Sequence, residues 1–590
     1  VLSRIVPVAT DLISIGDGTL IRRDCFFTGY RAVAGVLQLG PVTLGRDVVV
    51  GEHTVLDVGA TMGDGAQLGH TSALQAGQTV PAGEHWHGNP AEPTQVDYRR
   101  VAPARCGIMR KIGYSLAQLL GAVVLGMVVL GVAGMLLNDI PALVDALSPG
   151  QGSLTDPTFY TDVLAGSSVL FFGAVVVGLV VMVTVPRLLG RFVTPGTVYP
   201  LYGVPYALQQ TITWLSNSRF FMLLLGDSSF VVHYVRRLGY DLGRVLQTGS
   251  NFGTDLRHDS PHLCTVGTGT MVADGLSIMN ADFSATSFRV SHVTIGARNF
   301  LGNNIAFPSG AKVGENCLLG TKVMVPVDGP VRENVGLLGS PPFEIPRSVR
   351  RDLGSDGASA AWIDEDERHR RLPAKNRFNA VTLITVLVLR WFQFVLTTLL
   401  PAACAVLDSH TGPAVVMAEV VAVVVVNIGY AVLLERAVLG FGRLTPKFCS
   451  IYDRYFWGHE RLWKVLVNVP LLNGTPFKNL IWRLAGVRIG RRVFDDGCGI
   501  PEKTLVTIGD DVVLNAGSVI QCHSLEDGYF KSGRSSVGDG AVLGVKAFVH
   551  YGVSMGEGSV LDADSFLMKG EEIPPNAHWR GNPATQARQR

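Results

Sequence analysis

The chain has 590 residues, of which 47% are hydrophobic and only 17% are charged, and its formal net charge is +2. This length predicts about four domains, and the high hydrophobic content indicates membrane segments rather than an entirely soluble protein. The small net charge argues against nucleic-acid binding. The eight cysteines form no CxxC pair, so they are expected to be small buried residues of a reducing compartment.

Residues 1–97 are expected to form a β-helix domain, because large apolar side chains recur there at every sixth position. The positions are Leu44, Val50, Leu56, Met62, Leu68 and Leu74. A six-residue period fits neither an α-helix nor an alternating strand. It fits a solenoid whose triangular coils use three short strands each. Because Val1 aligns inside a domain, we expect an upstream part of the protein to be missing from this sequence.

The same domain occurs twice more. A shift of 242 residues aligns 252–348 with 494–590 without a gap, and a shift of 493 aligns 1–97 with that region. The ladder returns in the second copy at Ile295, Leu301, Phe307, Val313, Leu319 and Val325, and in the third at Val537, Leu543, Val549, Met555, Leu561 and Leu567. The sequence therefore predicts three tandem copies of one all-β domain.

Transmembrane hairpins are predicted between the copies, at 112–190 and 378–437. Each contains two apolar runs long enough to span a bilayer, namely Leu116–Leu137, Leu164–Val185, Ala380–Leu400 and Val415–Leu434. Basic residues flank the outer ends of each hairpin, whereas its loop lacks Lys and Arg. By the positive-inside rule, the chain is a multi-pass protein of the cytoplasmic membrane with all three β-helix domains on the cytoplasmic side.

The second hairpin differs from the first because it carries charges inside its spans. Arg390 lies about ten residues and Glu419 about fifteen residues from the cytoplasmic ends, an axial offset of roughly 7–8 Å. Since charges inside a bilayer are costly and usually have a partner, we expect Arg390 and Glu419 to pair, directly or through water. The alternative is that Arg390 reaches the cytoplasmic surface.

Linkers are predicted at 192–251 and 441–493, after each hairpin, and a polar solvated linker at 349–377. The first two are rich in aromatic residues: Tyr199, Tyr202, Tyr206 and Trp214, then Tyr452, Tyr455, Phe456, Trp457 and Trp463. These aromatic residues suit helices lying on the membrane surface. They would equally suit a core packed against the solenoid, and the sequence leaves both possibilities open.

The third copy carries the strongest candidate for chemistry. Its ladder is interrupted at Leu525–Ser535, which predicts an extruded loop with His523 at its root. The aligned residues are Ala281 and Tyr30, so His523 is not required for packing. Histidine is suited to accept a proton near neutral pH, and Glu526 could orient its other nitrogen. Cys522 is a weaker alternative as a nucleophile, because its only basic neighbour is His523.

The extruded loop and the terminal segment Gly581-Asn582-Pro583-Ala584 resemble those of hexapeptide-repeat acyltransferases, whose fold is a left-handed β-helix. The resemblance implies that His523 is the general base and that Trp579, Arg580, Gly581 and Asn582 lie along a pantetheine thioester. The terminal segment could also be only a turn that ends the solenoid. Such enzymes are trimers with active sites between subunits, so the three copies are expected to form a monomeric pseudo-threefold assembly with one complete groove. No metal site is predicted.

The alternation of helix pairs with three soluble domains is similar to the C-terminal region of nonribosomal peptide synthetases of the ε-poly-L-lysine synthetase type. This resemblance implies upstream adenylation and carrier domains, a phosphopantetheine thioester as donor, and an amine acceptor such as an amino acid or growing peptide. No cofactor is expected to be bound within the chain itself. Two alternatives stay open: an acyltransferase that uses soluble acyl-coenzyme A on a small amine or hydroxyl, and a non-catalytic scaffold or polymer exporter.

Overall fold

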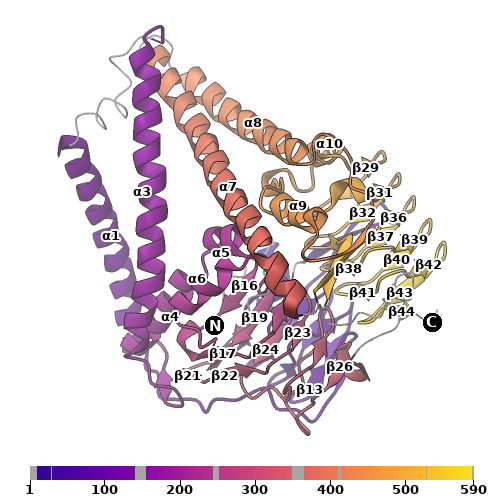
Figure 1. Cartoon of the computed structure of the whole chain (residues 1–590). Helices are drawn as coiled ribbons and strands as arrows, with labels where there is room; N and C mark the ends of the chain where they lie inside the picture. The colour runs from indigo at the N-terminus through magenta and orange to yellow at the C-terminus, as the bar shows by residue number, and fades with distance from the viewer. Residues whose placement is uncertain are drawn as a thin grey trace.

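The computed structural model describes residues 9–27, 29–139, 154–242, 251–347, 365–408, 413–526 and 528–587. The three aligned segments each form short strands that pair in parallel from one coil to the next, and the helices between them extend away from these strands (Figure 1). Parts of the predicted linkers, hairpin loops and first domain, including 1–8, 140–153, 243–250, 348–364 and 409–412, lie outside the described residues.

The third segment shows how the six-residue period builds the coils. Its strands are β31 (Val506–Ile508), β32 (Val513–Leu514), β33 (Val519–Ile520), β36 (Ser535–Val537), β37 (Val542–Leu543), β38 (Phe548–Val549), β39 (Ser554–Met555), β40 (Val560–Leu561), β41 (Phe566–Leu567), β42 (Glu572–Ile573) and β43 (His578–Arg580). Val537 pairs with Met555, and Met555 pairs with Ile573. One coil is therefore three hexads, and every predicted ladder residue of the three copies is buried.

The copies meet at equivalent coil corners, where a closed ring of backbone hydrogen bonds joins them. Asn89 N donates to Ser340 O over 2.7 Å, Ser340 N to Asn582 O over 3.0 Å, and Asn582 N to Asn89 O over 3.1 Å. These three residues align in the sequence of the copies. The ring explains the terminal segment as a junction between copies as well as the end of each solenoid.

Each copy also extrudes a β-hairpin at the position predicted from the break in the third ladder. The hairpins are β4–β5 (Tyr30–Val33, Val36–Leu39), β20–β21 (Ala281–Phe283, Ser287–Val290) and β34–β35 (His523–Glu526, Tyr529–Ser532). In the second and third copies, a strand of the preceding linker adds to the hairpin: β15 (Val198–Pro200) and β28 (Phe448–Ser450). The aligned residues Tyr30, Ala281 and His523 all begin a hairpin strand.

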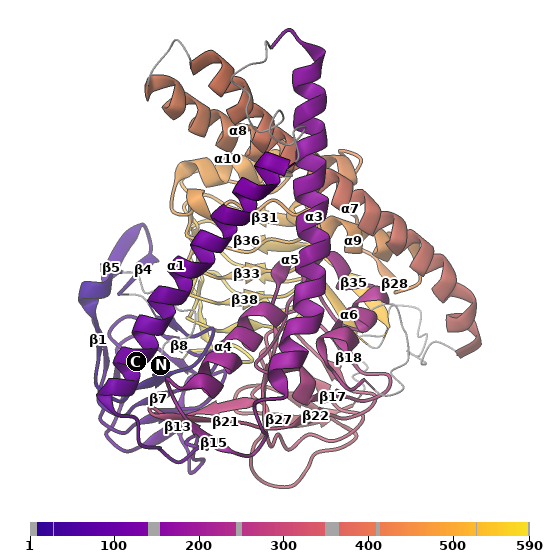
Figure 2. The same cartoon turned by 90° about the vertical axis from the view of Figure 1, so that its left-hand side faces the viewer.

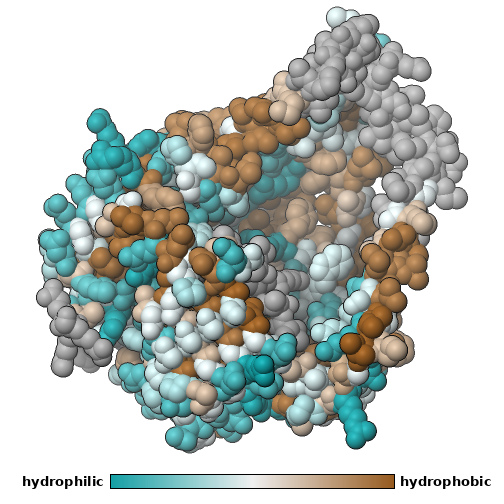
Figure 3. Space-filling view, turned by 180° about the vertical axis from the view of Figure 1, so that it is seen from behind, coloured by the Kyte–Doolittle hydropathy of each residue, from teal (hydrophilic) through white to brown (hydrophobic). Residues whose placement is uncertain are grey.

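Four long helices form the predicted hairpins: α1 (Ile108–Asp139), α3 (Pro157–Gly190), α7 (Glu365–Asp408) and α8 (Pro413–Val438). Among the described residues, three helical stretches are long and apolar enough to cross a membrane: Pro157–Gly190, His369–Cys404 and Met417–Val438. α3 contacts α7, and α7 contacts α8. Figures 1 and 2 show both helix pairs projecting on the same side of the sheets, and Figure 3 shows hydrophobic surface over the helical part and a largely hydrophilic lower surface.

The described end of the predicted polar linker at 349–377 is helical, because α7 already begins at Glu365, and its residues 369–371 are exposed as expected of a solvated segment. The charged residues before the apolar run are good helix formers, so the helix extends beyond the apolar stretch that the sequence marks.

The structure does not bring Arg390 and Glu419 into direct contact. The guanidinium of Arg390 donates to Gln393 Oε1 over 3.0 Å and to the carbonyl oxygen of Lys464 over 3.3 Å. The sequence positions of Arg390 and Glu419 set how deep each residue lies along its helix, but they do not set the direction in which each side chain points. The direct ion pair is therefore absent from the described residues, and a water-bridged pair stays a prediction.

The linkers fold into short helices that pack on the coils: α4 (Val204–Ser216), α5 (Arg219–Leu225), α6 (Phe230–Leu238), α9 (Arg454–Trp463) and α10 (Pro476–Ala485). Tyr206, Tyr452, Phe456 and Trp457 are buried, whereas Trp214 is exposed. The buried aromatic residues form cores with the hairpins of the second and third copies. Packing against the solenoid therefore accounts for most of these residues.

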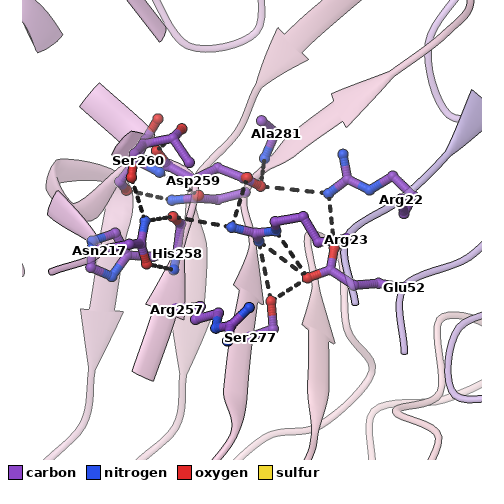
Figure 4. A network of polar contacts seen from close by, with 12 residues as sticks. Arg22, Arg23, Glu52, Asn217, Arg257, His258, Asp259, Ser260, Ser277 and Ala281 are labelled. Atoms are coloured by element: carbon purple, nitrogen blue, oxygen red, sulfur yellow. Dashed lines mark hydrogen bonds and ion pairs between the residues drawn. The ribbon is translucent and has the colours of Figure 1, made fainter. Parts of the chain in front are cut away.

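A buried network of ions joins the first copy to the second (Figure 4). Glu52 lies 3.2 Å from both Arg22 and Arg23, and Asp259 of the second copy lies 3.6 Å and 3.3 Å from the same arginines. Ser277 also donates to Glu52. Burial alone would raise the pKa of the Glu52 carboxyl, but Arg23 and Arg22 hold it at about 2.

Substitution Glu52→Gln is expected to destabilise the protein by about 3–5 kcal/mol, because it leaves two buried guanidinium groups short of a counter-charge. The matched control is Glu315→Gln, which removes the exposed pair of Glu315 with Arg298 and should cost less than about 1 kcal/mol. Thermal unfolding of the purified full chain measures both. Equal effects of the two substitutions would contradict a structural role for the network.

Candidate functional site

His523 is the first residue of β34, where the chain leaves the coil to form the hairpin. It pairs across the hairpin with Ser532. The coil immediately before it lies against the second copy, because Asn303 donates its side-chain amide to Gln521 Oε1 over 2.9 Å. Gln521 in turn donates to the carbonyl oxygen of His523 over 3.1 Å. The root of the hairpin is thereby fixed at the seam between the second and third copies.

The carboxylate that faces His523 is Glu502. Its Oε1 lies 2.8 Å from His523 Nδ1, and its side chain is fully buried. Glu502 precedes the 3-10 turn Lys503–Leu505, so it belongs to the neighbouring coil of the same copy. The backbone N–H of Cys522 donates to Glu502 Oε2 over 3.0 Å. Stacking of coils therefore joins two residues that are separated by a whole coil in the sequence.

Trp463, at the end of α9, completes this pair. Its indole Nε1 donates to Glu502 Oε1 over 2.7 Å. Its ring lies over the imidazole of His523 at a centroid distance of 4.6 Å. Phe530 of the hairpin also stacks on the same imidazole at 5.8 Å, and its ring lies 6.1 Å from that of Trp463. Two aromatic rings and one carboxylate thus fix the orientation of His523.

The electrostatics of the site keep Glu502 ionised. Burial alone would raise the pKa of its carboxyl, but His523, with further contributions from His459 and Trp463, holds it at about 2. Burial lowers the pKa of the nearby His459 to about 4, so His459 is neutral near pH 7. A carboxylate at Nδ1 favours the tautomer that carries its proton there and leaves the Nε2 lone pair available.

Glu526 does not orient His523, and this part of the prediction is wrong. Its Oε2 lies 3.4 Å from Lys569 Nζ and 3.5 Å from Lys531 Nζ. Successive side chains of a strand point to opposite faces, so residues 523 and 526 of one strand face opposite ways.

Cys522 is also placed outside the chemistry. Its side chain is fully buried, and burial raises the pKa of the thiol to about 12. A thiolate is required for nucleophilic attack, so the structure disfavours Cys522 as a nucleophile.

The four terminal residues predicted to bind pantetheine lie on two faces of the third copy: Trp579 and Arg580 belong to β43, which pairs with β40, whereas Gly581 and Asn582 lie on the face of β33, β38 and β41. Phe566 N donates to Gly581 O, so 581–584 forms the rung that follows β33, β38 and β41. Three strand spacings, roughly 14 Å, therefore separate residues 581–584 from strand β33, which ends at Ile520, just before the hairpin root. Asn582 donates to the carbonyl oxygen of Lys322 over 2.7 Å, Trp579 packs partly on the core, and Arg580 is exposed. The binding roles of these residues stay predictions.

The equivalent positions in the other two seams are filled by contacts between copies. At the seam of the first and second copies, Ala281 N donates to Asp259, which the buried Arg22 and Arg23 also contact. At the seam of the first and third copies, the hydroxyl of Tyr30 donates to Asp496 Oδ2 over 2.7 Å. Among the described residues, the pairing of a histidine with a buried carboxylate at a hairpin root occurs in the third copy alone.

Glu502 and Trp463 are the residues that sequence reasoning missed. The signal for Glu502 was present, because it aligns with Ser260 and Ala9 and is thus as specific to the third copy as His523 is. Trp463 stood among the aromatic residues of the linker, and nothing in the sequence distinguished it from its neighbours.

Comparisons with known proteins agree with a hexapeptide-type solenoid. Residues 535–569 match the family described as the hexapeptide repeat of succinyl-transferase. The chain is 24% identical over 602 positions to the delta-poly-L-ornithine synthetase of Acinetobacter baumannii strain AB307-0294. The aligned region covers 97% of this chain and 43% of that protein. The chain thus spans less than half of this relative's length. The resemblance of this chain to synthetases of the ε-poly-L-lysine type stays a prediction.

Similarity to solved structures is confined to a fraction of the chain. A hexapeptide-repeat acetyltransferase from Vibrio cholerae is 22% identical, with a TM-score of 0.17, over 18% of this chain and 63% of that one. A galactoside acetyltransferase in complex with coenzyme A is 27% identical, with a TM-score of 0.16, over 18% of this chain and 55% of that one.

The low pKa of Glu502 predicts how its contribution to stability depends on pH. A carboxyl whose folded pKa is depressed to about 2 stabilises the fold fully above the ordinary carboxyl range, and this contribution is lost as the pH falls through about 2. The difference in unfolding temperature between the wild type and Glu502→Gln should therefore be constant from about pH 8 to 5 and shrink at lower pH. A difference that disappears between pH 7 and 5 would show that Glu502 is protonated near neutrality.

Proposed function

We propose that this chain is the amide-forming part of a larger synthetase that joins an aminoacyl thioester to an amine. The observation that carries the proposal is the arrangement of His523, Glu502 and Trp463 at a seam between copies. A histidine with one nitrogen against a buried carboxylate and the other available is a suitable general base. The similarity to a poly-L-ornithine synthetase over 97% of the chain supports an amine as acceptor and an amino acid as the transferred group.

In this mechanism His523 acts on the acceptor. The acceptor ammonium first loses one proton to water, and the free amine attacks the thioester carbonyl carbon while Nε2 accepts the second proton from its nitrogen. The new C–N bond forms, the C–S bond breaks, and the thiolate leaves with a proton returned from the imidazolium. Glu502 stabilises the imidazolium by its charge, while Trp463 and Phe530 hold the ring in place. The thioester is already activated, so a positioned base and proximity are sufficient chemistry.

The donor is proposed to be a phosphopantetheine thioester on a carrier domain upstream of this chain, loaded by an adenylation domain. The pantetheine arm would pass the corner formed by Trp579, Arg580, Gly581 and Asn582 and reach roughly 14 Å from Gly581 and Asn582, along the face of β33, β38 and β41, to His523. Support comes from the position of Gly581 and Asn582 on that face, at the seam with the second copy, where Asn582 donates to the carbonyl oxygen of Lys322. The growing product would be an amino-acid homopolymer, as in the ε-poly-L-lysine or poly-L-ornithine type.

We further propose that the copies form a pseudo-threefold assembly in one chain, on the cytoplasmic side of the membrane. The closed ring of Asn89, Ser340 and Asn582 supports the symmetry. The projection of both helix pairs on one side supports insertion as hairpins (Figure 2). Tethering by these hairpins would keep the copies at high effective concentration. The first and second copies would then complete and orient the single active groove.

Substitution His523→Ala is expected to reduce amide formation by about 10²–10⁴-fold, the usual contribution of a general base. The assay uses the full chain in detergent with an aminoacyl-pantetheine thioester and L-ornithine, and the amide is detected by mass spectrometry. His578→Ala is the matched control, because His578 lies in the same copy but is half exposed and pairs with Asp562. Turnover of His523→Ala within about threefold of the control would remove His523 from the mechanism.

Glu502→Gln is expected to lower kcat by about 10-fold or more with little change in KM, because the carboxylate acts through His523 and not on the substrate. Glu526→Gln should leave both constants within about twofold, since Glu526 pairs with lysines away from the imidazole. Partial recovery in Glu502→Asp would separate the charge from the packing of the side chain. A loss of kcat in Glu526→Gln alone would restore the interpretation that the structure overturns.

The same assay distinguishes the two possible donors, aminoacyl-coenzyme A and a thioester on a carrier domain. If aminoacyl-coenzyme A supports turnover as well as a thioester on a carrier domain, the chain is a coenzyme A-dependent acyltransferase. If neither donor gives product while the fold is intact, the chain is a scaffold or exporter.

A further inference from the structure

A cavity lies at the junction of all three copies, with a volume of about 150 Å³. Residues of the three copies line it at aligned coil corners. In chain order, three successive coils each contribute one corner from every copy. The first set is Asp24, Gly275 and Gly517, the second is His53, Asn304 and Lys546, and the third is Thr71, Lys322 and Asp564. The cavity therefore lies where the copies surround a common axis, above the ring of backbone hydrogen bonds.

The aligned corners share one backbone conformation but differ in chemistry. His53, Asn304 and Lys546 have φ values of 57°, 56° and 58°. Asn is the residue that adopts this left-handed conformation most readily after glycine, yet two of the three copies place a titratable side chain there. The conformation is common to the corners, so it does not account for the choice of a histidine and a lysine.

Several polar atoms that face this cavity lack a hydrogen-bond partner, although the other oxygen of Asp24, Oδ1, accepts from the guanidinium of Arg257 over 2.6 Å. His53 Nε2 and Asp24 Oδ2 are buried and have no hydrogen-bond partner. The ammonium of Lys546 forms no ion pair with any residue that the structure describes and lies 5.6 Å from the ring of Phe26. A buried polar group without a partner is costly, so these atoms are suited to a ligand that carries both a donor and an acceptor.

The exposure of the lining residues shows where the cavity opens. The side chain of Asp255 is 43% exposed and that of Arg257 25%, whereas Lys322 and Asp564, which pair with each other, are 10% and 9% exposed. The entrance is thus beside Asp255 and Arg257, and the closed end is at the Lys322–Asp564 pair. A smaller cavity between Arg257 and the junction of α4 and α5 adjoins this entrance. A small molecule could therefore enter from the side on which the linker helices lie.

We propose that the axial cavity binds a free α-amino acid. Its carboxylate would accept hydrogen bonds from Lys546 and His53, and its ammonium would donate to Asp24. A ligand of about six to nine non-hydrogen atoms suits the volume, since an apolar cavity of roughly this size takes up benzene. The site is distinct from the proposed acyl-transfer groove, but the choice of a diamino acid as one probe rests on the proposed function.

A metal ion is the competing occupant, because donor atoms of Asp24, Glu52 and His53 lie within 4.8 Å of one another. Two observations favour the amino acid. Both oxygens of Glu52 already contact Arg22 and Arg23. Burial lowers the pKa of His53, the carboxylates of Asp24 and Glu52 oppose this shift, and the cations of Lys546 and Arg257 add to it. The second observation is that the oxygen Oδ1 of Asp24 already accepts from Arg257 over 2.6 Å. A divalent cation would therefore meet two carboxylates that already have arginine counter-charges, whereas the carboxylate of an amino acid would meet the ammonium of Lys546.

The cavity and the proposed groove are adjacent, so the test must distinguish binding in the cavity from binding in the groove. Asn303, next to the cavity residue Asn304, donates to Gln521, and Gln521 donates to the carbonyl of His523. Binding is therefore measured in the full chain in detergent by calorimetry, in both the wild type and His523→Ala. The probes are L-alanine, L-ornithine, putrescine, which lacks the carboxylate, and ZnCl₂.

Substitutions that install the residue of an aligned copy provide variants compatible with the backbone. Lys546→Asn and His53→Asn copy Asn304, and Asp24→Gly copies Gly275 and Gly517. Lys546→Asn should weaken L-alanine and L-ornithine by about 10- to 100-fold, as expected for loss of a hydrogen bond to a charged group, and should leave putrescine unaffected. Asp24→Gly should weaken all three amines. Lys312→Asn, outside the cavity, is the control and should bind like the wild type.

Binding of both amino acids that survives in His523→Ala and falls in Lys546→Asn would support the axial site, whatever the outcome of the acyl-transfer assay. Three results would overturn it: no binding of either amino acid at millimolar concentration, equal binding by Lys546→Asn and the control, or loss of binding in His523→Ala. Binding of Zn²⁺ that is lost in Asp24→Gly and His53→Asn, without amino-acid binding, would assign the cavity to a metal instead.

Discussion

The structure depends on the stacking of coils whose register repeats after three hexads. Because each coil returns to the same corner, aligned residues of the three copies meet at one junction, where Asn89, Ser340 and Asn582 close a ring of backbone hydrogen bonds. Backbone groups make this ring, so it tolerates any side chain that the corner can hold. The copies can therefore diverge in chemistry without losing the contact that joins them, and this freedom underlies both the groove and the axial cavity.

The side chains of the three copies differ most where the hairpins leave the coils. The aligned residues Tyr30, Ala281 and His523 occupy the same strand position, but the first donates to Asp496, the second lies against a buried ion network, and the third faces Glu502. Buried ion pairs stabilise little in net terms, but the loss of one partner is severe. We infer that the network between the first and second copies specifies which copies meet, whereas the proposed chemistry lies at the seam of the second and third copies.

The six-residue period predicted the coils, the three copies and the extruded loop, because one inward side chain per face requires that spacing. It could not predict Glu502 as the partner of His523, since the partner comes from a neighbouring coil and a local strand rule excludes Glu526. The depths of Arg390 and Glu419 were readable from the hydropathy pattern, but the directions of their side chains depend on helix packing. The axial cavity escaped prediction because its lining residues become neighbours only through assembly of the copies.

The central claim is that one of three equivalent seams performs acyl transfer. Photo-crosslinking with a pantetheine thioester analogue that carries a diazirine on its acyl group, followed by peptide mass spectrometry, tests this claim most directly. If the third-copy groove alone is active, adducts form on the third-copy hairpin around His523 and on the facing part of the second copy, and none form around Tyr30 or Ala281. Adducts of equal abundance at all three hairpins, or none at His523, would contradict the assignment of a single active groove.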